Sequence, residues 1–465
     1  MYFQLYSRSV RLRRGGVTPL TVLSLALLLG VVAVAVDGGS LMEQRRHVQA
    51  TADAAALAAA DDLFVNYAGN QGTDPSGTAQ TSALAIAQAN GFSNDGVQSI
   101  VTVNVSPQKY QGGPNAGQSL PAGYVEVIVQ YNAERTFSNV FGAGTVPVRA
   151  RAVARGQWTP TNKNVIALNL GAPSAVSVAG SGGGLLGLGG LLGGGCCLNV
   201  KGVVQINSNS KTALSLTGGG TLVALAIDLV QGLVGILGSL LGLLGLGGSP
   251  PAINAVPPTA DPLRYLPDPD PVKLGLTLQV NGQVNTGGTV HLRPGVYSGG
   301  IQVSGGSTVV LHANLDGTPG IYVLQGGGFA VSDTSNVQMA VGETAGIMLY
   351  NGWSQSSDTV NLQTSGKMIL TPPSSGPYKG LCIFQKRGTY SSAAPLLTIT
   401  AKGTANIGGT LYAVYAKVSL SSGNNNNVLG GQIISDTLGV SGSNTVNIDP
   451  GTQPIAHTRI LGLVE

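Results

Sequence analysis

The sequence predicts a mainly β chain that follows a single N-terminal membrane helix. Glycine supplies 70 of the 465 residues, only 9% of the residues are charged, and short runs of Val, Ile and Leu alternate with Gly, Asn, Ser and Thr. This alternation is typical of many short strands joined by tight turns. The N-terminal region differs, because residues 17–36 carry no charge at all.

The apolar stretch 17–36 has the length of a membrane anchor, because about 20 helical residues cross a ~30 Å hydrocarbon core. Its positions expected to face lipid include Val17, Leu20, Leu23, Leu27, Val31 and Val36. Arginines precede it, among them Arg11, Arg13 and Arg14, and the first charge after it is Asp37. Cationic flanks resist translocation, so we expect residues 1–16 to stay cytoplasmic and the rest to be exported. A cleaved signal peptide, cut at Ala33-Val34-Ala35, is the alternative; the stretch is longer than a typical signal core.

A second helical segment follows the apolar stretch. Residues 41–63 are rich in Ala and in unbranched side chains, which are the best helix formers, so we expect one long helix across both segments. Leu41, Val48 and Ala52 mark a modest apolar stripe along it. Two interpretations stay open: the stripe packs on the protein's own domain, or it is a helix–helix assembly surface.

Two motifs stand at this helical junction. An Ala-Val-Asp-Gly exit ends the apolar stretch, and the run Gln-x-x-x-Asp-Ala-Ala-Ala-Leu-Ala-Ala-Ala follows it. The motif residues are Asp37, Gln49, Asp53, Ala54, Ala55 and Leu57. Together they make residues 14–62 closely similar to the N-terminal region of TadG-like proteins, which belong to the bacterial tight-adherence (Flp pilus) assembly group.

The resemblance implies a pilin-like α+β plan for residues 37–158, in which a long helix precedes a small sheet. Independently of it, residues 100–105 and 124–129 have the β-branched content and partial alternation of strands. The resemblance also implies a single-pass protein of the bacterial inner membrane, with its bulk periplasmic or extracellular and its partners among envelope or pilus-assembly proteins.

The sequence departs from the related families in two places. Cleavage after Gly16 would put Thr21 where processed prepilins usually carry Glu, so we do not expect growth into a pilus fibre. The Asp-x-Ser-x-Ser metal motif that some TadG proteins carry is absent from the sequence.

Residues 159–465 predict a right-handed parallel β-helix, with a β-sandwich as the alternative. Short β-branched runs such as Thr308–Leu311 recur at intervals of roughly 10–25 residues, the coarse signature of stacked solenoid rungs. We interpret two Gly/Leu-rich tracts, 180–195 and 229–248, as insertions that leave a rung and pack on the body or dock on a partner or membrane surface. The Pro-rich stretch 250–271 predicts an extended linker or a strap.

Residues that could carry chemistry are sparse in this region. Asp316 and Asp333 could be brought together by stacking of successive rungs, as a carbohydrate-active enzyme would need, but such Asp residues more often cap their own turns. His291 and His312 lie 21 residues apart and could stack on adjacent rungs. We interpret them as surface or turn residues and not as a metal pair.

Aromatic and cysteine side chains leave further alternatives open. A carbohydrate-binding face could be formed by Tyr297, Tyr322, Tyr350, Trp353, Tyr378 and Tyr390, although packing within strand faces is the more ordinary interpretation. Among the three cysteines, a disulfide between Cys382 and either Cys196 or Cys197 is possible, and so are three free thiols.

These observations favour a non-enzymatic, membrane-anchored structural protein of the cell envelope, in tight-adherence pilus assembly or surface attachment. The alternatives are a glycan-binding adhesin and a β-helix carbohydrate-active enzyme. The net charge of +4 equals that of four N-terminal arginines, so no nucleic-acid partner is expected. No cofactor, no metal and no catalytic residue is predicted.

Overall fold

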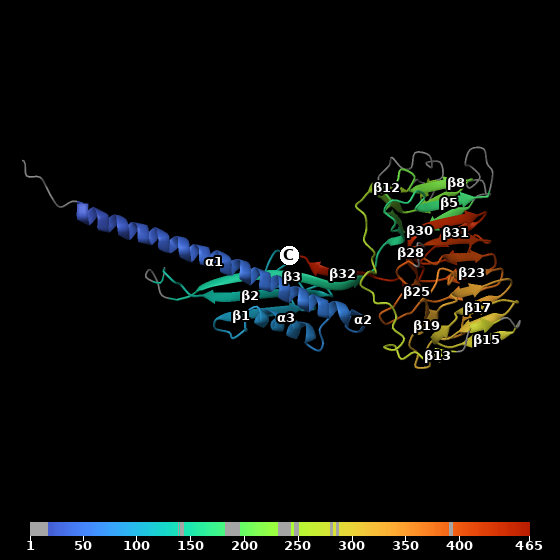
Figure 1. Ribbon diagram of the computed structural model, residues 1–465, viewed down its shortest axis with the longest axis horizontal. Helices are drawn as coiled ribbons and strands as arrows, with labels where there is room; N and C mark the ends of the chain where they lie inside the picture. Colours follow the sequence, from blue (N-terminus) through green and yellow to red (C-terminus); the bar gives the residue numbers. More distant parts are fainter. Residues whose placement is uncertain are drawn as a thin grey trace, which may run out of the picture. The chain divides into compact units, whose positions relative to one another are not determined.

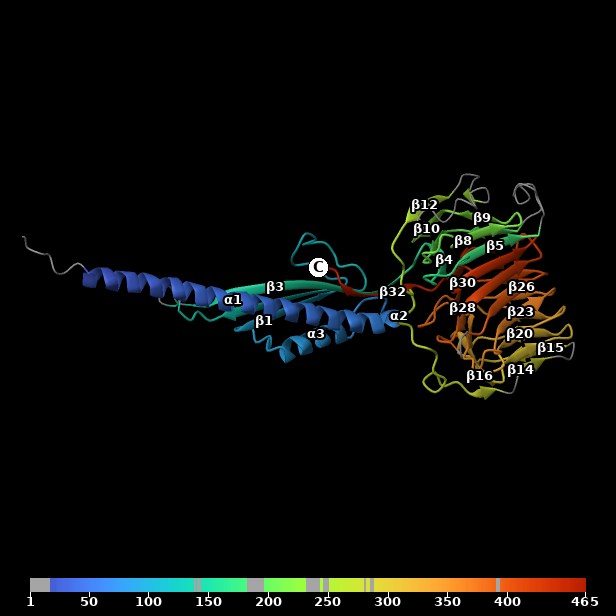
Figure 2. The same cartoon turned by 45° about the horizontal axis from the view of Figure 1, so that its top comes forward.

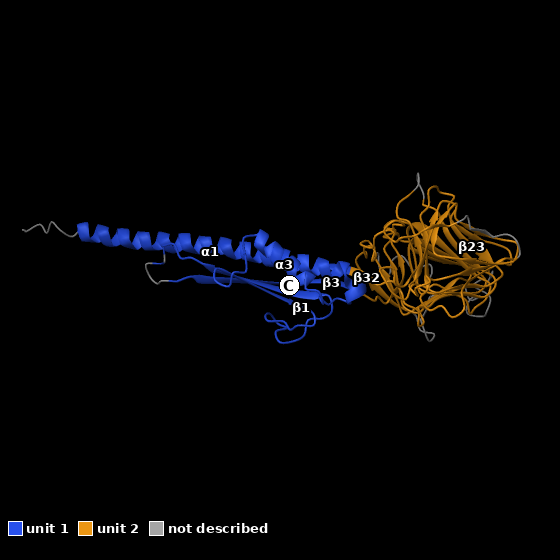
Figure 3. Ribbon diagram, turned by 90° about the horizontal axis from the view of Figure 1, so that it is seen from below, with its two compact units in different colours: residues 1–157, 460–465 blue, residues 158–459 orange. Residues whose placement is uncertain are grey.

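The computed structural model describes residues 17–137, 139, 144–181, 196–230, 243–245, 251–279, 282–284, 288–389 and 394–465, with the side chains of 243–245 and 282–284 left out. Arg11, Arg13 and Arg14, most of both Gly/Leu tracts, and Tyr390 lie outside these residues. Strands make up 40% of the structure and helices 17%, which confirms the predicted mainly β class. The chain divides into two compact units, Met1–Gln157 with Ile460–Glu465, and Trp158–Arg459 (Figure 3).

The first unit is a long helix packed on a small sheet. Its helices are α1 (Val17–Val65), α2 (Tyr67–Asn70) and α3 (Thr78–Ala89). Its strands lie in the order β1 (Ser99–Val105), β2 (Tyr124–Ala133), β3 (Val146–Thr159) and β32 (Thr458–Leu463), and the first three pair antiparallel. The two predicted helical segments are one helix, and the strands predicted at 100–105 and 124–129 are β1 and β2.

The composition of α1 explains where it packs. Its side chains are exposed or half-buried up to His47, and burial begins at Val48. The buried positions are mostly Ala: Val48, Thr51, Ala52, Ala55, Ala56, Ala59, Ala60, Leu63 and Phe64. These small side chains let the helix approach the sheet and α3 closely, with Ala79, Ala83 and Ala87 of α3 in the same core (Figure 1).

The second unit is built from short strands. Its first group comprises β4 (Lys163–Ala167), β5 (Val176–Gly180), β6 (Cys197–Val200), β7 (Val203–Ile206), β8 (Leu214–Thr217), β9 (Thr221–Ala224), β10 (Ala226–Leu229), β11 (Leu243–Gly245) and β12 (Ala252–Ala255). Its second group comprises β13 (Leu278–Gln279), β14 (Gly282–Val284), β15 (Thr289–Leu292), β16 (Gly295–Ser298), β17 (Ile301–Val303), β18 (Thr308–Leu311), β19 (Gly320–Gln325), β20 (Phe329–Val331), β21 (Asn336–Met339), β22 (Ile347–Asn351), β23 (Val360–Thr364), β24 (Met368–Leu370), β25 (Leu381–Gln385), β26 (Leu397–Ala401), β27 (Ala405–Ile407), β28 (Thr410–Ser422), β29 (Val428–Leu429), β30 (Gln432–Gly442) and β31 (Thr445–Ile448).

These strands pair in parallel with strands of the preceding and following turns of the chain. β16, β17 and β18 pair with β19, β20 and β21, and those pair with β22, β23 and β24. In one ladder Val309 lies between Val290 and Val337, and Val337 lies beside Met368, so apolar side chains stack on apolar side chains. Parallel pairing throughout agrees with the prediction of stacked strands and differs from the antiparallel pairing of most sandwiches.

The first and second groups of strands are joined by a pairing between strands that are far apart in the sequence. β4, the first strand of the unit, pairs with β7 on one side and with β30 on the other. The chain moves from β4 through β7 and β10 to β12, crosses to β13 at the opposite end of the stack, and returns turn by turn to β30 (Figures 1 and 2). Residues 256–277 make this crossing, so the Pro-rich stretch forms a strap.

Two apolar clusters stabilise the second unit. The larger lies between the stacked strands and includes fully buried Leu198, Ile301 and Ile399. The smaller lies beneath the strap, where Leu263 and Leu266 pack with strand side chains such as Phe384. The strap therefore buries one outer face of the stack that would otherwise expose aromatic and aliphatic side chains to water.

Candidate functional site

The N-terminal half of α1 exposes apolar side chains on all sides. The predicted lipid-facing residues Val17, Leu20, Leu23, Leu27, Val31 and Val36 are all exposed. Burying this much apolar surface in lipid is favourable, whereas leaving it in water is not. Among the described residues α1 is the one helix long and apolar enough to cross a membrane.

The C-terminal half of α1 carries every motif residue except Asp37 and lies against the sheet. Ala55 is fully buried, and Ala54, Leu57 and Asp53 are half-buried. A Cβ added at Gly156 of β3 would lie 1.8 Å from the backbone oxygen of Ala60, so helix and strand touch with no side chain between them. The alternative in which the apolar stripe packs on the protein's own domain is the one seen here.

Two polar motif residues fasten α1 to segments about a hundred residues away. The Gln49 amide donates to Asp53 Oδ1 at 2.7 Å and to the backbone oxygen of Arg151 at 3.1 Å. The Asp37 carboxylate accepts the backbone N–H of Phe137 at 3.1 and 3.2 Å. The motif thus combines a small-residue packing face with polar contacts that fix the helix along the sheet.

A buried carboxylate lies on the sheet of the same unit. Glu126 of β2 is fully buried and accepts hydrogen bonds from Arg151 Nε at 2.5 Å, Asn104 Nδ2 at 2.8 Å and the backbone N–H groups of Gln111 and Gly112 at 2.7 and 3.1 Å. Burial alone would raise the pKa of Glu126, but these hydrogen bonds outweigh it and the pKa is lowered.

The C-terminus completes this buried network. Arg151 also pairs with the side chain of Glu465, and its guanidinium lies over the ring of Tyr110. The sequence alone did not predict this network. Its one local signal was Glu126 itself, a charge inside the otherwise apolar run Tyr124–Val129.

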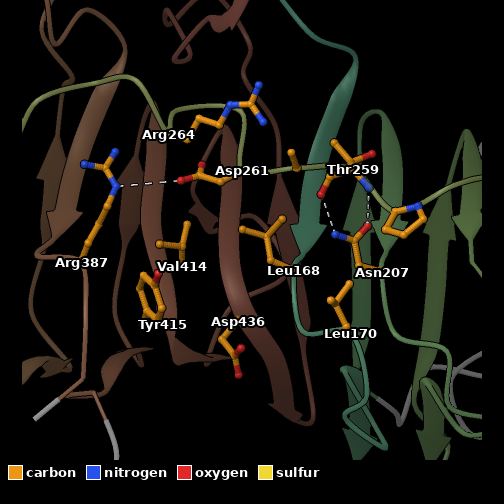
Figure 4. A pocket seen from close by; sticks show the side chains of 12 residues that line it. Leu168, Leu170, Asn207, Thr259, Asp261, Arg264, Arg387, Val414, Tyr415 and Asp436 are labelled. Atoms are coloured by element: carbon orange, nitrogen blue, oxygen red, sulfur yellow. Dashed lines mark hydrogen bonds and ion pairs between the residues drawn. The ribbon is translucent and has the colours of Figure 1, made fainter.

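The second unit has a groove of about 740 Å³ between the strap and the strands. Figure 4 shows the strap residues Thr259, Asp261 and Arg264 passing across the strands below. The groove is lined by Leu168, Leu170, Asn207, Pro258, Thr259, Ala260, Asp261, Arg264, Arg387, Val414, Tyr415 and Asp436. Tyr415 of β28 is 53% exposed there, so an aromatic ring faces the solvent beside charged groups.

Hydrogen bonds hold the strap side of this groove in place. Asn207 Nδ2 donates to the Thr259 backbone oxygen at 2.7 Å, and its Oδ1 accepts the Thr259 N–H at 2.9 Å. Arg387 donates to the backbone oxygens of Leu263 and Leu266 at 2.7 and 2.8 Å and pairs with Asp268 at 2.8 Å. The groove wall is therefore pre-formed.

Asp261 and Tyr412 continue this arrangement. The Tyr412 hydroxyl donates to Asp261 Oδ2 at 2.6 Å and accepts from Arg387 Nε at 2.7 Å. Burial, with the neighbouring Asp261 carboxylate adding to it, raises the pKa of Tyr412. The buried phenol therefore stays protonated and holds the carboxylate of Asp261, which lines the groove, in place.

The structure does not bring Asp316 and Asp333 together. Asp316 caps its own turn by accepting from the backbone N–H and hydroxyl of Thr318, and Asp333 accepts from Gly305 N–H at 3.2 Å. Neither arrangement is the facing carboxylate pair that glycoside hydrolysis uses. Turn capping is found for Asp316, whereas the Asp333 carboxylate joins its own turn to that of Gly305, 28 residues earlier in the chain.

The hypothesis of a carbohydrate-binding aromatic face is wrong for each of its residues that the structure describes, and packing within strand faces is found instead. Tyr297, Tyr322, Tyr350, Trp353 and Tyr378 are all buried, and Tyr390 lies outside the described residues. Tyr297 and Tyr322 stack on successive strands with ring centroids 5.9 Å apart. The rings fill the packing faces of the stack because a pleated strand surface accommodates them well.

The possible disulfide is absent, whereas the possible contact between two histidines is present. Cys196, Cys197 and Cys382 are all free thiols, so neither possible disulfide is present. His291 and His312 do lie on adjacent turns and are in direct contact. No group of three or more His, Cys, Asp or Glu side chains that could hold a metal occurs in the part of the chain that the structure describes.

Comparison with known proteins supports the N-terminal assignment. No curated protein and no solved structure matches the chain. A family match covers residues 15–62, which end within the buried half of α1 and contain every motif residue identified above. The matching family is described as putative Flp pilus-assembly TadE/G-like, in agreement with the resemblance to TadG-like proteins stated above.

Proposed function

We propose that the protein is a membrane-anchored structural component of the cell envelope that acts in tight-adherence pilus assembly or surface attachment. The observation that carries this proposal is the division of α1. Its first half is apolar and exposed, and its second half is buried on the protein's own sheet within the TadE/G-like region. One helix thus supplies an anchor and a rigid connection to folded protein.

The proposed organisation follows from this division. Residues 1–16 would be cytoplasmic, 17–36 would cross the inner membrane once, 37–158 would form the pilin-like region, and 159–465 would be an exported scaffold. We propose that the scaffold is a right-handed parallel β-helix, which the turn-by-turn parallel pairing supports. Envelope or pilus-assembly proteins would be its partners.

The topology can be tested on the full chain in cells. Protease added to intact spheroplasts should digest the second unit of the wild-type protein, and alkaline extraction should leave the chain in the membrane. Leu27→Arg places a charge in the centre of the anchor, which costs about 3 kcal/mol of insertion free energy, and should increase the extractable fraction. Leu27→Ala is the matched control. Protection of the second unit in spheroplasts would contradict the proposal.

A second candidate function is glycan binding in the groove of the second unit. The exposed ring of Tyr415 beside Arg264, Asp261 and Asp436 supports it, because sugars bind through aromatic faces together with charged and polar groups. On a glycan array, Tyr415→Ala should abolish a signal given by the detergent-solubilised chain. Leu315→Ala, at an exposed residue outside the groove, should leave it intact. No signal from the wild type would remove this candidate.

We propose no enzymatic activity for the chain. A polysaccharide panel tests this directly, because turnover that is lost on changing both Asp316 and Asp333 to Asn would favour the carbohydrate-active alternative. Absence of turnover on the panel would leave the structural role as the better explanation.

A further inference from the structure

Two histidines meet on the surface of the second unit. His291 belongs to β15, and His312 directly follows β18, the strand that pairs with β15. The Nδ1 atom of His291 and the Nε2 atom of His312 are 2.8 Å apart, and the ring centroids are 5.1 Å apart. His291 is exposed, and the His312 side chain is 13% exposed, so the pair can be reached from solvent.

Glu343 forms a hydrogen bond with the ring nitrogen of His312 that does not face His291. Its Oε1 lies 2.7 Å from His312 Nδ1, and its Oε2 accepts the Ala313 backbone N–H at 2.5 Å. Both carboxylate oxygens of Glu343 are therefore acceptors, so Nδ1 of His312 is the donor in this contact. In the neutral ring, Nε2 then carries a lone pair directed toward His291.

This arrangement contains the components of a two-histidine metal site. A carboxylate that accepts the far N–H of an imidazole orients a metal-ligating ring and raises its basicity. Two nitrogens 2.8 Å apart, each about 2.0 Å from a shared ion, subtend about 90° at that ion. That angle suits neighbouring positions of a tetragonal Cu²⁺ or Ni²⁺ ion better than the wider angle of tetrahedral Zn²⁺.

We propose that His291 and His312, oriented by Glu343, bind a divalent transition-metal ion of tetragonal preference at the surface of the second unit. The ion would replace the proton in the hydrogen bond between the two rings, and that proton would pass through water to Nε2 of His291, so that each ring stays neutral. Water would complete the coordination of the ion. Arg293, two residues after His291, carries a positive charge that opposes cation binding.

Copper binding to the full chain in detergent, purified without a histidine tag, tests the proposal. In the presence of a competing weak chelator, Cu²⁺ titration should give one equivalent of bound ion. The electron paramagnetic resonance spectrum should show hyperfine coupling to two nitrogens. His291→Ala and His312→Ala should each abolish this binding, and Glu343→Gln should weaken it by about tenfold. Arg293→Gln should strengthen it.

His47→Ala is the matched control, because His47 lies in α1 and contacts Phe92 instead of a second histidine. It should leave the copper affinity and spectrum unchanged. Circular dichroism of metal-free His291→Ala, a substitution at an exposed position, establishes that loss of binding does not come from unfolding. An unchanged spectrum in either pair variant, or no bound equivalent in the wild type, would overturn the proposal and leave a hydrogen-bonded pair only.

Discussion

The Gln49 side chain donates a hydrogen bond to the backbone oxygen of Arg151, 102 residues further along the chain, at 3.1 Å. This contact joins the family motif on α1 to β3. The Arg151 side chain in turn pairs with the buried carboxylate of Glu126. The motif, the sheet and the buried ion pair are therefore linked parts of one structure.

Gln49→Ala should loosen α1 from the sheet. The variant loses the contact to Arg151 and leaves that backbone oxygen without this donor, at a cost of about 1 kcal/mol. Hydrogen exchange measured by mass spectrometry should then be about fivefold faster at the amides of β3. Glu43→Ala, at an exposed position earlier in α1, should leave exchange unchanged. Equal exchange in both variants would show that the contact does not hold the helix.

Gly156→Ala should destabilise the same unit by a different route. The new Cβ would lie 1.8 Å from the Ala60 oxygen, so the backbones must move apart. Overpacking of this kind costs about 1–3 kcal/mol, and the melting temperature of the unit should fall. Gly69→Ala is the matched control, because an added Cβ there meets nothing within 4 Å. A melting temperature that is the same in both variants would contradict the close packing.

Acid should destabilise the first unit through Glu126. The pKa of this carboxyl is lowered in the folded protein, so its contribution to stability is fully present above the unfolded-state pKa of about 4.3. That contribution is lost as the pH falls through the lower folded-state pKa. Thermal melts followed from pH 6 to pH 2 should show this loss.

Glu126→Gln separates this effect from general acid denaturation. It leaves Arg151 without its fully buried partner, at a cost of about 3 kcal/mol, and should flatten the pH dependence below pH 5. Glu134→Gln, at an exposed position on the chain, should keep the wild-type profile. A wild-type profile in Glu126→Gln would show that other carboxyls cause the acid sensitivity.

Arg387→Ala should release the strap of the second unit. The variant loses the hydrogen bonds to the backbone oxygens of Leu263 and Leu266 and the ion pair with Asp268. Limited proteolysis should then cut within residues 256–277 sooner than in the wild type, because cleavage follows local opening. Arg264→Ala, which removes a cation that stacks on Tyr265, should change the cleavage rate much less. A cleavage rate equal to that of the wild type would contradict the role of Arg387 in holding the strap.

Local patterns in the sequence predicted the elements but not their long-range partners. Ala-rich composition and the charge-free run predict a continuous α1, and β-branched runs predict β1, β2 and the stacked strands. The pairing of β4 with β30 could not be predicted, since these strands lie more than 250 residues apart and any turn of a repetitive stack offers a similar edge. The sequence favoured packing of Tyr297 and Tyr322 within strand faces, which is what their burial shows. It left a binding face open as the alternative, because a strand pattern does not distinguish an aromatic packing face from an aromatic binding face.

The three cysteines should resist modification in the folded chain. Desolvation by burial raises the pKa of Cys382 to about 12 and that of Cys196 to about 11, and burial also raises the pKa of Cys197. The reactive thiolate is therefore scarce at pH 8, and iodoacetamide should label Cys382 and Cys196 far more slowly than a free thiol. Cys197 is only half-buried and should be the first to react. In denaturant all three should label without a reductant, because no disulfide links them; fewer than three labelled thiols would contradict the free state seen here.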